Sequence, residues 1–423
     1  MRPIRRDILT LFCVSCAAIT PPLAAQDLAA AIAAAQATAP ALAEAEAGEA
    51  AAAGRLDRAR AEGNPLLRVE GTAGFGRIDN DGFFGITADN VNPLALQATA
   101  EMPLFAGGRV RSAVDQARGG ADLARYRTMQ ARLDVGVQAV AAYAEVLASR
   151  QIEQSRERLV AELSEVERQA GLRFKVGEIS SSERAQAMAR KAEAEAGLAA
   201  ARGRRMSAEA AFARLTGLPP SDLAPMPALP AVPASLGEAI ELAAVNSPAL
   251  KQAEQGVVIA RAAERGARAQ GMPTIGAFAE AAHVRDQFFP GYKANSASVG
   301  LRGRWTPFAG GRTSADTRTA AAELASAEAA ARQARQNLEG LVIDSWHGLT
   351  AAEAVLVASQ ARVTAAEAAL RGIRLEARVG AKPTLAVLDA EREATEAQTA
   401  LIDAEGRRQV TAWRLNALTG AGQ

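Results

Sequence analysis

The stretch Pro103-Leu104-Phe105-Ala106-Gly107-Gly108-Arg109 separates two kinds of sequence periodicity. Before it, from Leu94 to Leu104, apolar and polar residues alternate, which is typical of a strand with one apolar face. After it, apolar residues recur every three or four positions to about Gln169, which is typical of a long helix packed in a coiled coil. The stretch therefore marks a junction where a strand passes into a helix.

This junction occurs twice, because Phe105–Arg109 recurs as Phe308–Arg312. The copies lie about 200 residues apart, far beyond the period of 20 to 50 residues that marks a solenoid. We therefore expect one structural unit that has been duplicated. The expected organisation is a signal peptide at 1–25, a first unit at 26–217, a proline-rich linker at 218–234 and a second unit at 235–423.

Each unit contains one predicted hairpin, at 66–104 and at 274–306. Thr274 to Val284 alternates only weakly, whereas the other three segments alternate clearly. Each segment is about ten residues long, enough for a tilted strand to cross a bilayer. Four strands cannot close a barrel, so several chains should close one together and lipid should cover the apolar faces. Two hairpins of a soluble domain are the alternative interpretation.

The polar faces of these strands are expected to line the interior of the barrel. Trp305 follows the last strand, where an interfacial aromatic residue is expected. The candidate lumen residues are Arg68, Glu70, Gln97, Thr99, Glu101, Arg302 and Arg304.

The composition favours long helices in close contact. Aromatic residues make up only 4% of the chain, and alanine, glutamate, arginine, glutamine and leucine dominate. The net charge of +1 argues against a nucleic-acid partner, which would need a basic face. After the signal peptide we expect no apolar run long enough for a transmembrane helix.

The N-terminus has the order of a secretory signal: basic residues, a short apolar stretch from Ile8 to Ile19, and a cleavage site after Ala25. A buried N-terminal helix is the alternative. The only cysteines, Cys13 and Cys16, lie inside this signal, so the mature chain should have no disulfide and no thiolate metal site. Lipidation of Cys16 is disfavoured, because the three residues before it match a lipidation box poorly.

These features together resemble the TolC-like outer membrane efflux proteins. The resemblance rests on the signal, the order of elements and their double occurrence, and covers essentially the whole mature chain. It implies a mixed α+β membrane protein: a homotrimeric, twelve-stranded transmembrane β-barrel with four strands per chain, continued by a long periplasmic α-helical coiled-coil tunnel. It also implies that no cofactor and no metal are bound.

The function that the resemblance implies is that of an outer membrane channel. Such a channel is the passive exit duct of a tripartite efflux pump or a type I secretion system. The implied partners are a periplasmic adaptor (membrane fusion) protein, an inner-membrane transporter of the RND, ABC or MFS type, and outer membrane lipid. The cargo is not indicated, so drugs, metal ions, polysaccharide and secreted polypeptides all stay open.

Two further sites follow from the resemblance, position by position. The adaptor-docking tips would be Val176, Gly177, Glu178, Val379, Gly380 and Ala381. The periplasmic gate would be Lys382 and Asp389, with Ser182 and Glu183 of a neighbouring chain. Ala377 and Ala386 stand where the family pattern has a tyrosine and a second aspartate, which indicates a looser gate. A plain helix–helix turn with a glycine cap is the alternative for the tips, and an exposed residue on a helix face is the alternative for Asp389.

Two other functions account for only part of the sequence. An exported coiled-coil protein without a pore would explain the helical periodicity but not the alternating segments at matched positions. An enzyme is disfavoured, because the chain has only His283 and His347 as histidines and no serine-hydrolase, zinc-protease or phosphate-binding motif.

Overall fold

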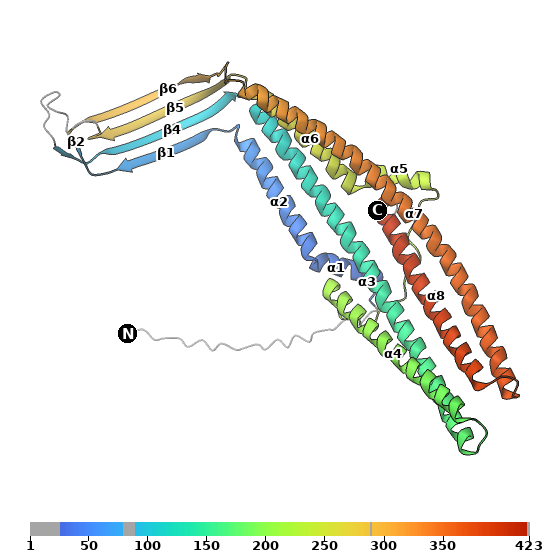
Figure 1. Ribbon diagram of the computed structural model, residues 1–423. Helices are drawn as coiled ribbons and strands as arrows, with labels where there is room; N and C mark the ends of the chain where they lie inside the picture. Colours follow the sequence, from blue (N-terminus) through green and yellow to red (C-terminus); the bar gives the residue numbers. More distant parts are fainter. Residues whose placement is uncertain (1–25, 79–88, 288–289, 421–423) are drawn as a thin grey trace, which may run out of the picture.

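The structure is a computed structural model of one protomer and describes residues 26–78, 89–287 and 290–420. The predicted signal peptide, with Cys13 and Cys16, lies outside the described residues. The protomer is elongated, with a β-sheet at one end and long helices at the other (Figure 1). The helices are α1 (Leu28–Thr38), α2 (Pro40–Ala61), α3 (Arg109–Lys175), α4 (Ser181–Thr216), α5 (Leu236–Asn246), α6 (Pro248–Ala269), α7 (Arg312–Arg378) and α8 (Thr384–Thr419).

The four-stranded sheet is antiparallel throughout, in the order β1-β4-β5-β6. A separate ribbon of β2 and β3 extends the β1–β4 hairpin beyond it. Despite its weak alternation, the segment from Thr274 forms a full twelve-residue strand, because β4 and β6 both pair with it. The strands are β1 (Leu66–Ala73), β2 (Gly76–Ile78), β3 (Asp89–Val91), β4 (Leu94–Phe105), β5 (Thr274–Arg285) and β6 (Lys293–Arg304).

The strand-to-helix junctions depend on paired glycines. Gly107 and Gly108 have φ angles of 61° and 92°, and Gly310 and Gly311 have φ angles of 62° and 88°. A side chain resists this left-handed region. At Gly107 an added Cβ would also lie 2.4 Å from the Cβ of Met272. The repeated Gly-Gly therefore lets each chain end a strand and begin a helix within a few residues.

The two halves of the described chain have helices of equal length. The helices α3 and α7 each contain 67 residues, and α4 and α8 each contain 36. At 1.5 Å per residue the longer pair spans about 100 Å. The sequence predicted an end near Gln169, but α3 runs to Lys175, because its last turn continues into the Val176-Gly177 cap.

A buried aromatic pair lies where the proline-rich linker crosses α3. Tyr143 and Phe212 are both fully buried and meet edge to face, with ring centroids 6.1 Å apart. The Tyr143 hydroxyl lies 2.8 Å from the Gln26 carbonyl oxygen and 2.7 Å from that of Ala224, so it can donate to either. Burial raises the pKa of Tyr143 above its ordinary value. The contact fixes the linker against the helices.

The expectation that no later segment could cross a bilayer is wrong for one helix. By length and composition alone, α7 contains an apolar stretch long enough to do so, and most of that stretch is exposed in the protomer. The helices α1 and α2 pass the same test only as one pair, which is bent by 56°. Alanine explains the discrepancy, because it raises mean hydropathy without providing a bulky side chain.

Candidate functional site

The polar face of the sheet gathers all seven predicted lumen residues. The register pairs Arg68 with Thr99 and Glu70 with Gln97, which places these four side chains on one face. The same register continues through β5 and puts Glu101, Arg302 and Arg304 on that face. The strand register alone establishes that these seven residues share one face of the sheet. That the face lines a pore stays a prediction.

Side chains on this face are connected across strands. The Arg302 guanidinium donates to a Glu101 carboxylate oxygen at 2.9 Å and lies over the Phe278 ring, 4.6 Å from its centroid. Gln97 donates to Glu280 at 2.6 Å. Glu280 and Phe278 are not among the lumen residues predicted from the sequence, because Thr274 to Val284 alternates only weakly. Taking every second residue from Thr274 would have found both.

The opposite face of the sheet is apolar and uncovered in the protomer. Val299 is 84% exposed and Leu301 70% exposed, and Leu67 and Val69 of β1 share the face. Bulky apolar side chains on one face of a tilted sheet fit contact with lipid. The sheet thus has the two chemically different faces that a membrane barrel requires.

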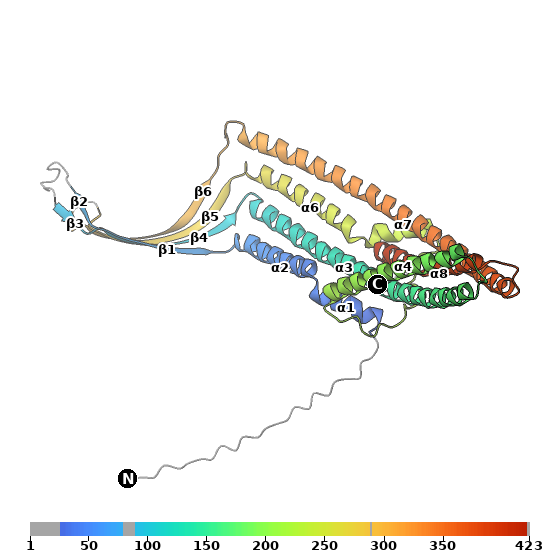
Figure 2. The ribbon, with the colours of Figure 1, turned by 60° about the horizontal axis from the view of Figure 1, so that its bottom comes forward.

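The turns between α3 and α4 and between α7 and α8 lie together at the end of the molecule farthest from the sheet (Figures 1 and 2). Gly177 and Gly380 both have φ 78°. The backbone N–H of Glu178 donates to the carbonyl oxygen of Arg173, and that of Ala381 donates to the carbonyl oxygen of Glu376, each at 2.9 Å. The two predicted tips therefore share the same backbone geometry, and each turn is a helix end capped by a glycine.

Each tip also presents one large apolar side chain to solvent. Val176 is 77% exposed and Val379 81% exposed. Valines as exposed as these contribute little to packing within the protomer. This exposure is compatible with a docking surface, which stays a prediction.

The predicted gate residues all have contacts within the protomer. Lys382 lies 4.0 Å from Glu376, and Asp389 lies 3.0 Å from Arg190 of α4. Glu183 belongs to the capping box of α4, where its carboxylate accepts from the Ser180 backbone N–H at 3.0 Å. The Ser182 hydroxyl lies 3.0 Å from that of Ser180. The sequence did not indicate Arg190, which partly neutralises Asp389.

A charged cluster joins the two helical hairpins above the tips. Arg374 of α7 donates to Glu391 of α8 at 2.7 Å and lies 3.1 Å from Glu162 of α3. Glu391 is only 5% exposed. Burial, reinforced by the nearby Glu162, raises the pKa of Glu391 to about 7, although Arg374 opposes the shift. The sequence gave no sign of this cluster, because its members lie on three helices.

The Glu391→Gln variant should make the stability of the helical region less dependent on pH. Folded Glu391 keeps a proton that unfolded glutamate loses near its ordinary pKa of 4.5, so stability falls as the pH rises from about 4.5 to 7. Glutamine should abolish this decline, because its amide does not titrate in this range and can still accept a hydrogen bond from Arg374. Thermal unfolding of the detergent-solubilised protein between pH 5 and 8 measures the effect. Parallel pH profiles for parent and variant would contradict the assignment.

Comparison with known proteins comes from sequence and from fold. The family described as "Outer membrane efflux protein" matches residues 31–218 and 239–421. The chain is 32% identical over 286 residues to the outer membrane efflux protein BepC of Brucella suis biovar 1 (strain 1330). That match covers 67% of this chain and 62% of BepC, so the chain spans less than two thirds of that relative.

Solved structures share the fold at low sequence identity. A membrane protein from Pseudomonas aeruginosa has a TM-score of 0.81 at 21% identity, with 93% of each chain covered. The Campylobacter jejuni outer membrane channel CmeC has a TM-score of 0.82 at 14% identity, covering 93% of this chain and 86% of its own. The Vibrio cholerae outer membrane protein VceC has a TM-score of 0.79 at 20% identity, covering 93% and 96%.

Proposed function

The chain belongs to the outer membrane efflux protein family, and from that premise we propose that it is the passive exit duct of an export system. The observation that supports this most is the open sheet with one polar and one apolar face, attached to helices about 100 Å long. A barrel with a polar interior lets solutes cross the outer membrane, and a helical tunnel carries them through the periplasm. No catalytic step is required.

The duct is proposed to be a homotrimer. Within the described residues, β1 and β6 each pair along one edge only, so both edges of the sheet retain free backbone donors and acceptors. Pairing β1 of one copy with β6 of the next would satisfy both edges. Three four-stranded sheets would then close a twelve-stranded barrel.

The end of the molecule farthest from the sheet is proposed to bind the partner proteins that supply energy for export. The two tips, each with an exposed valine, offer docking points for a periplasmic adaptor protein. An inner-membrane transporter would deliver cargo to the tunnel through that adaptor. RND, ABC and MFS transporters all remain candidates, and so does type I secretion.

Membrane fractionation and planar-bilayer recording test the duct. We expect the mature protein in the outer membrane fraction, as a trimer that heat dissociates in detergent, and we expect it to conduct ions. A soluble periplasmic monomer would refute the proposal. So would a membrane-bound trimer that never conducts when its periplasmic mouth is opened by mutation. The pore-less coiled-coil alternative predicts the first of these results.

The gate is proposed to be a set of weak contacts at the periplasmic mouth, with Lys382 reaching Ser182 or Glu183 of the next chain. Exposed ion pairs contribute about 0–1 kcal/mol each, so three would yield to a docking partner. Lys382→Glu should raise the resting conductance, because it adds like charge beside Glu376 and Glu183.

A second comparison addresses Asp389 at the same mouth. Asp389→Ala should weaken block by divalent cations, whereas Arg190→Gln should strengthen it by removing the partner 3.0 Å away. Unchanged currents in all three variants would place the constriction elsewhere.

A further inference from the structure

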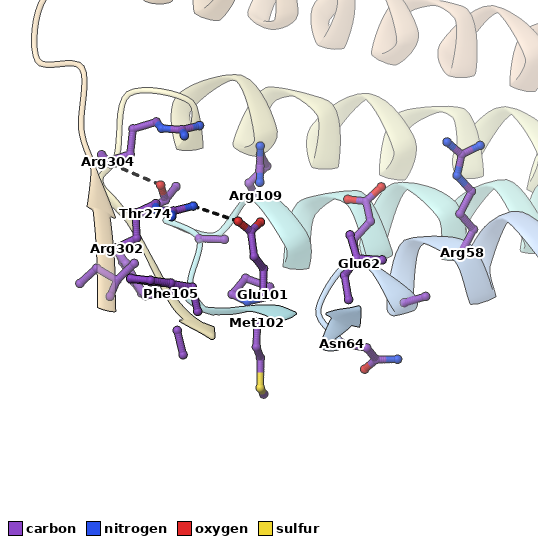
Figure 3. A pocket seen from close by; sticks show the side chains of 18 residues that line it. Arg58, Glu62, Asn64, Glu101, Met102, Phe105, Arg109, Thr274, Arg302 and Arg304 are labelled. Carbon is purple, nitrogen blue, oxygen red and sulfur yellow. Dashed lines mark hydrogen bonds and ion pairs between the residues drawn. The ribbon is translucent and has the colours of Figure 1, made fainter. Parts of the chain in front are cut away.

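A cavity of about 480 Å³ lies where the sheet meets the helices (Figure 3). Its walls come from the end of α2, the junction between β4 and α3, and the adjoining ends of β5 and β6. Strand pairing brings these distant segments together, since Glu101 pairs with Leu66 on one side and Phe278 on the other. Both halves of the chain are therefore needed to form the cavity.

The cavity has an excess of positive charge. Four arginines from three elements line it, against two carboxylates, Glu62 and Glu101. Among the residues that the structure describes, only Arg302 of these arginines forms an ion pair, with Glu101 at 2.9 Å. Figure 3 shows Arg302 reaching Glu101, while Arg109 and Arg304 lie beside them without a carboxylate partner. The arginines are Arg58, Arg109, Arg302 and Arg304.

Apolar and aromatic groups occupy the rest of the wall. Phe105 and Phe278 both line the cavity, together with Leu66 and Met102. Phe278 stacks under the Arg302 guanidinium, which helps to hold that side chain in place. A cavity that combines unpaired guanidinium groups with aromatic rings fits a ligand carrying both negative charge and a flat apolar body.

We infer that this cavity binds small aromatic anions, such as aryl carboxylates and aryl sulfonates, on their way through the protein. The inference rests on the proposed function, because it takes the polar face of the sheet as the lumen. Arg109 and Arg304 supply the charge that pairs with the anionic group, and Phe105 and Phe278 contact the ring. The site would select cargo by charge at the entrance to the barrel.

The binding test uses the full mature chain in lipid nanodiscs and naphthalene disulfonate as probe. Its two sulfonates keep it out of lipid, so calorimetry reports binding to protein. We expect saturable binding, about tenfold weaker in the double variant Arg109→Gln/Arg304→Gln. The matched control is Arg55→Gln/Arg312→Gln, which removes the same charge from outside the cavity: Arg55 lies one turn before Arg58, and Arg312 is the repeat counterpart of Arg109.

Three probes and one parallel recording decide the outcome. Inorganic sulfate and a naphthalene carrying two trimethylammonium groups should both bind far more weakly than the disulfonate. Absence of binding to the parent, equal losses in the two double variants, or sulfate binding as tight as the disulfonate would each overturn the site. Planar-bilayer recording of the same preparation separates the two proposals. A conducting protein that does not bind refutes the site alone. Binding by a protein that does not conduct even when Lys382→Glu opens its periplasmic mouth refutes the duct.

Discussion

Replacing Val299 and Leu301 together with arginine is expected to remove the protein from the outer membrane. Both residues are at least 70% exposed on the apolar face of β6, whose one pairing strand among the described residues is β5. An arginine facing lipid near the middle of the bilayer costs about 2–4 kcal/mol. With two such arginines in each chain of a trimer, we expect the summed cost to exceed the free energy gained by inserting the barrel into the membrane.

The matched control is Ser298→Arg, one residue before Val299 on the same strand. Ser298 faces the other way and pairs across the strands with Glu280, so an arginine there meets water and a carboxylate. We expect the control to accumulate as heat-modifiable trimer and the double variant to be degraded or recovered in the periplasm. Equal outer membrane levels of the two variants would reverse the assignment of the faces.

Changing both tip glycines to valine should abolish export while leaving the trimer in the membrane. Gly177 and Gly380 have φ 78°, and an added Cβ would meet no atom within 4 Å at either position. The effect would therefore come from the backbone alone, since a β-branched residue resists positive φ at a cost of about 1–3 kcal/mol. Both turns should reshape and displace Val176 and Val379 from their common geometry.

Glycines in the adjoining helices provide the control. Gly171 of α3 and Gly372 of α7 lie near the same tips, have helical backbone, and leave open space around an added Cβ. The Gly171→Val/Gly372→Val variant should export cargo at close to the parental rate. Export is measured as cellular resistance to a transported compound or as accumulation of a fluorescent one. Normal export by the tip variant would remove the tips from the docking proposal.

The fold class could be predicted from sequence because its main signals are local and repeated. Alternation before Gly107-Gly108 and helical periodicity after it indicated a strand followed by a long helix, and the second copy repeated the pattern. The prediction of a TolC-like fold is confirmed by the family match and the structural likenesses. Two details differed from the prediction: α3 ends later than expected, at Lys175, and α7 contains a longer apolar stretch than expected.

The contacts of the site residues could not be predicted in the same way. Arg190 and Asp389 are separated by about 200 residues, and only the packing of α4 beside α8 brings them to 3.0 Å. The cluster of Glu162, Arg374 and Glu391 needs three helices in fixed rotation about their axes. Periodicity indicates which face of a helix is apolar, but not which polar residue of another helix will lie opposite. The roles of the tips and the gate remain predictions.

The equal lengths of α3 and α7, and of α4 and α8, should restrict which insertions and deletions the protein can tolerate. Since α3 and α7 each have 67 residues, they span equal lengths between the sheet and the two tips. Deleting one residue from either would retract its tip by about 1.5 Å and rotate everything beyond by about 100°. We therefore expect insertions and deletions to be tolerated only as matched events of whole heptads in all four long helices. Relatives with longer or shorter reach should differ in steps of about 10 Å, and a single-codon deletion should be more harmful here than most substitutions.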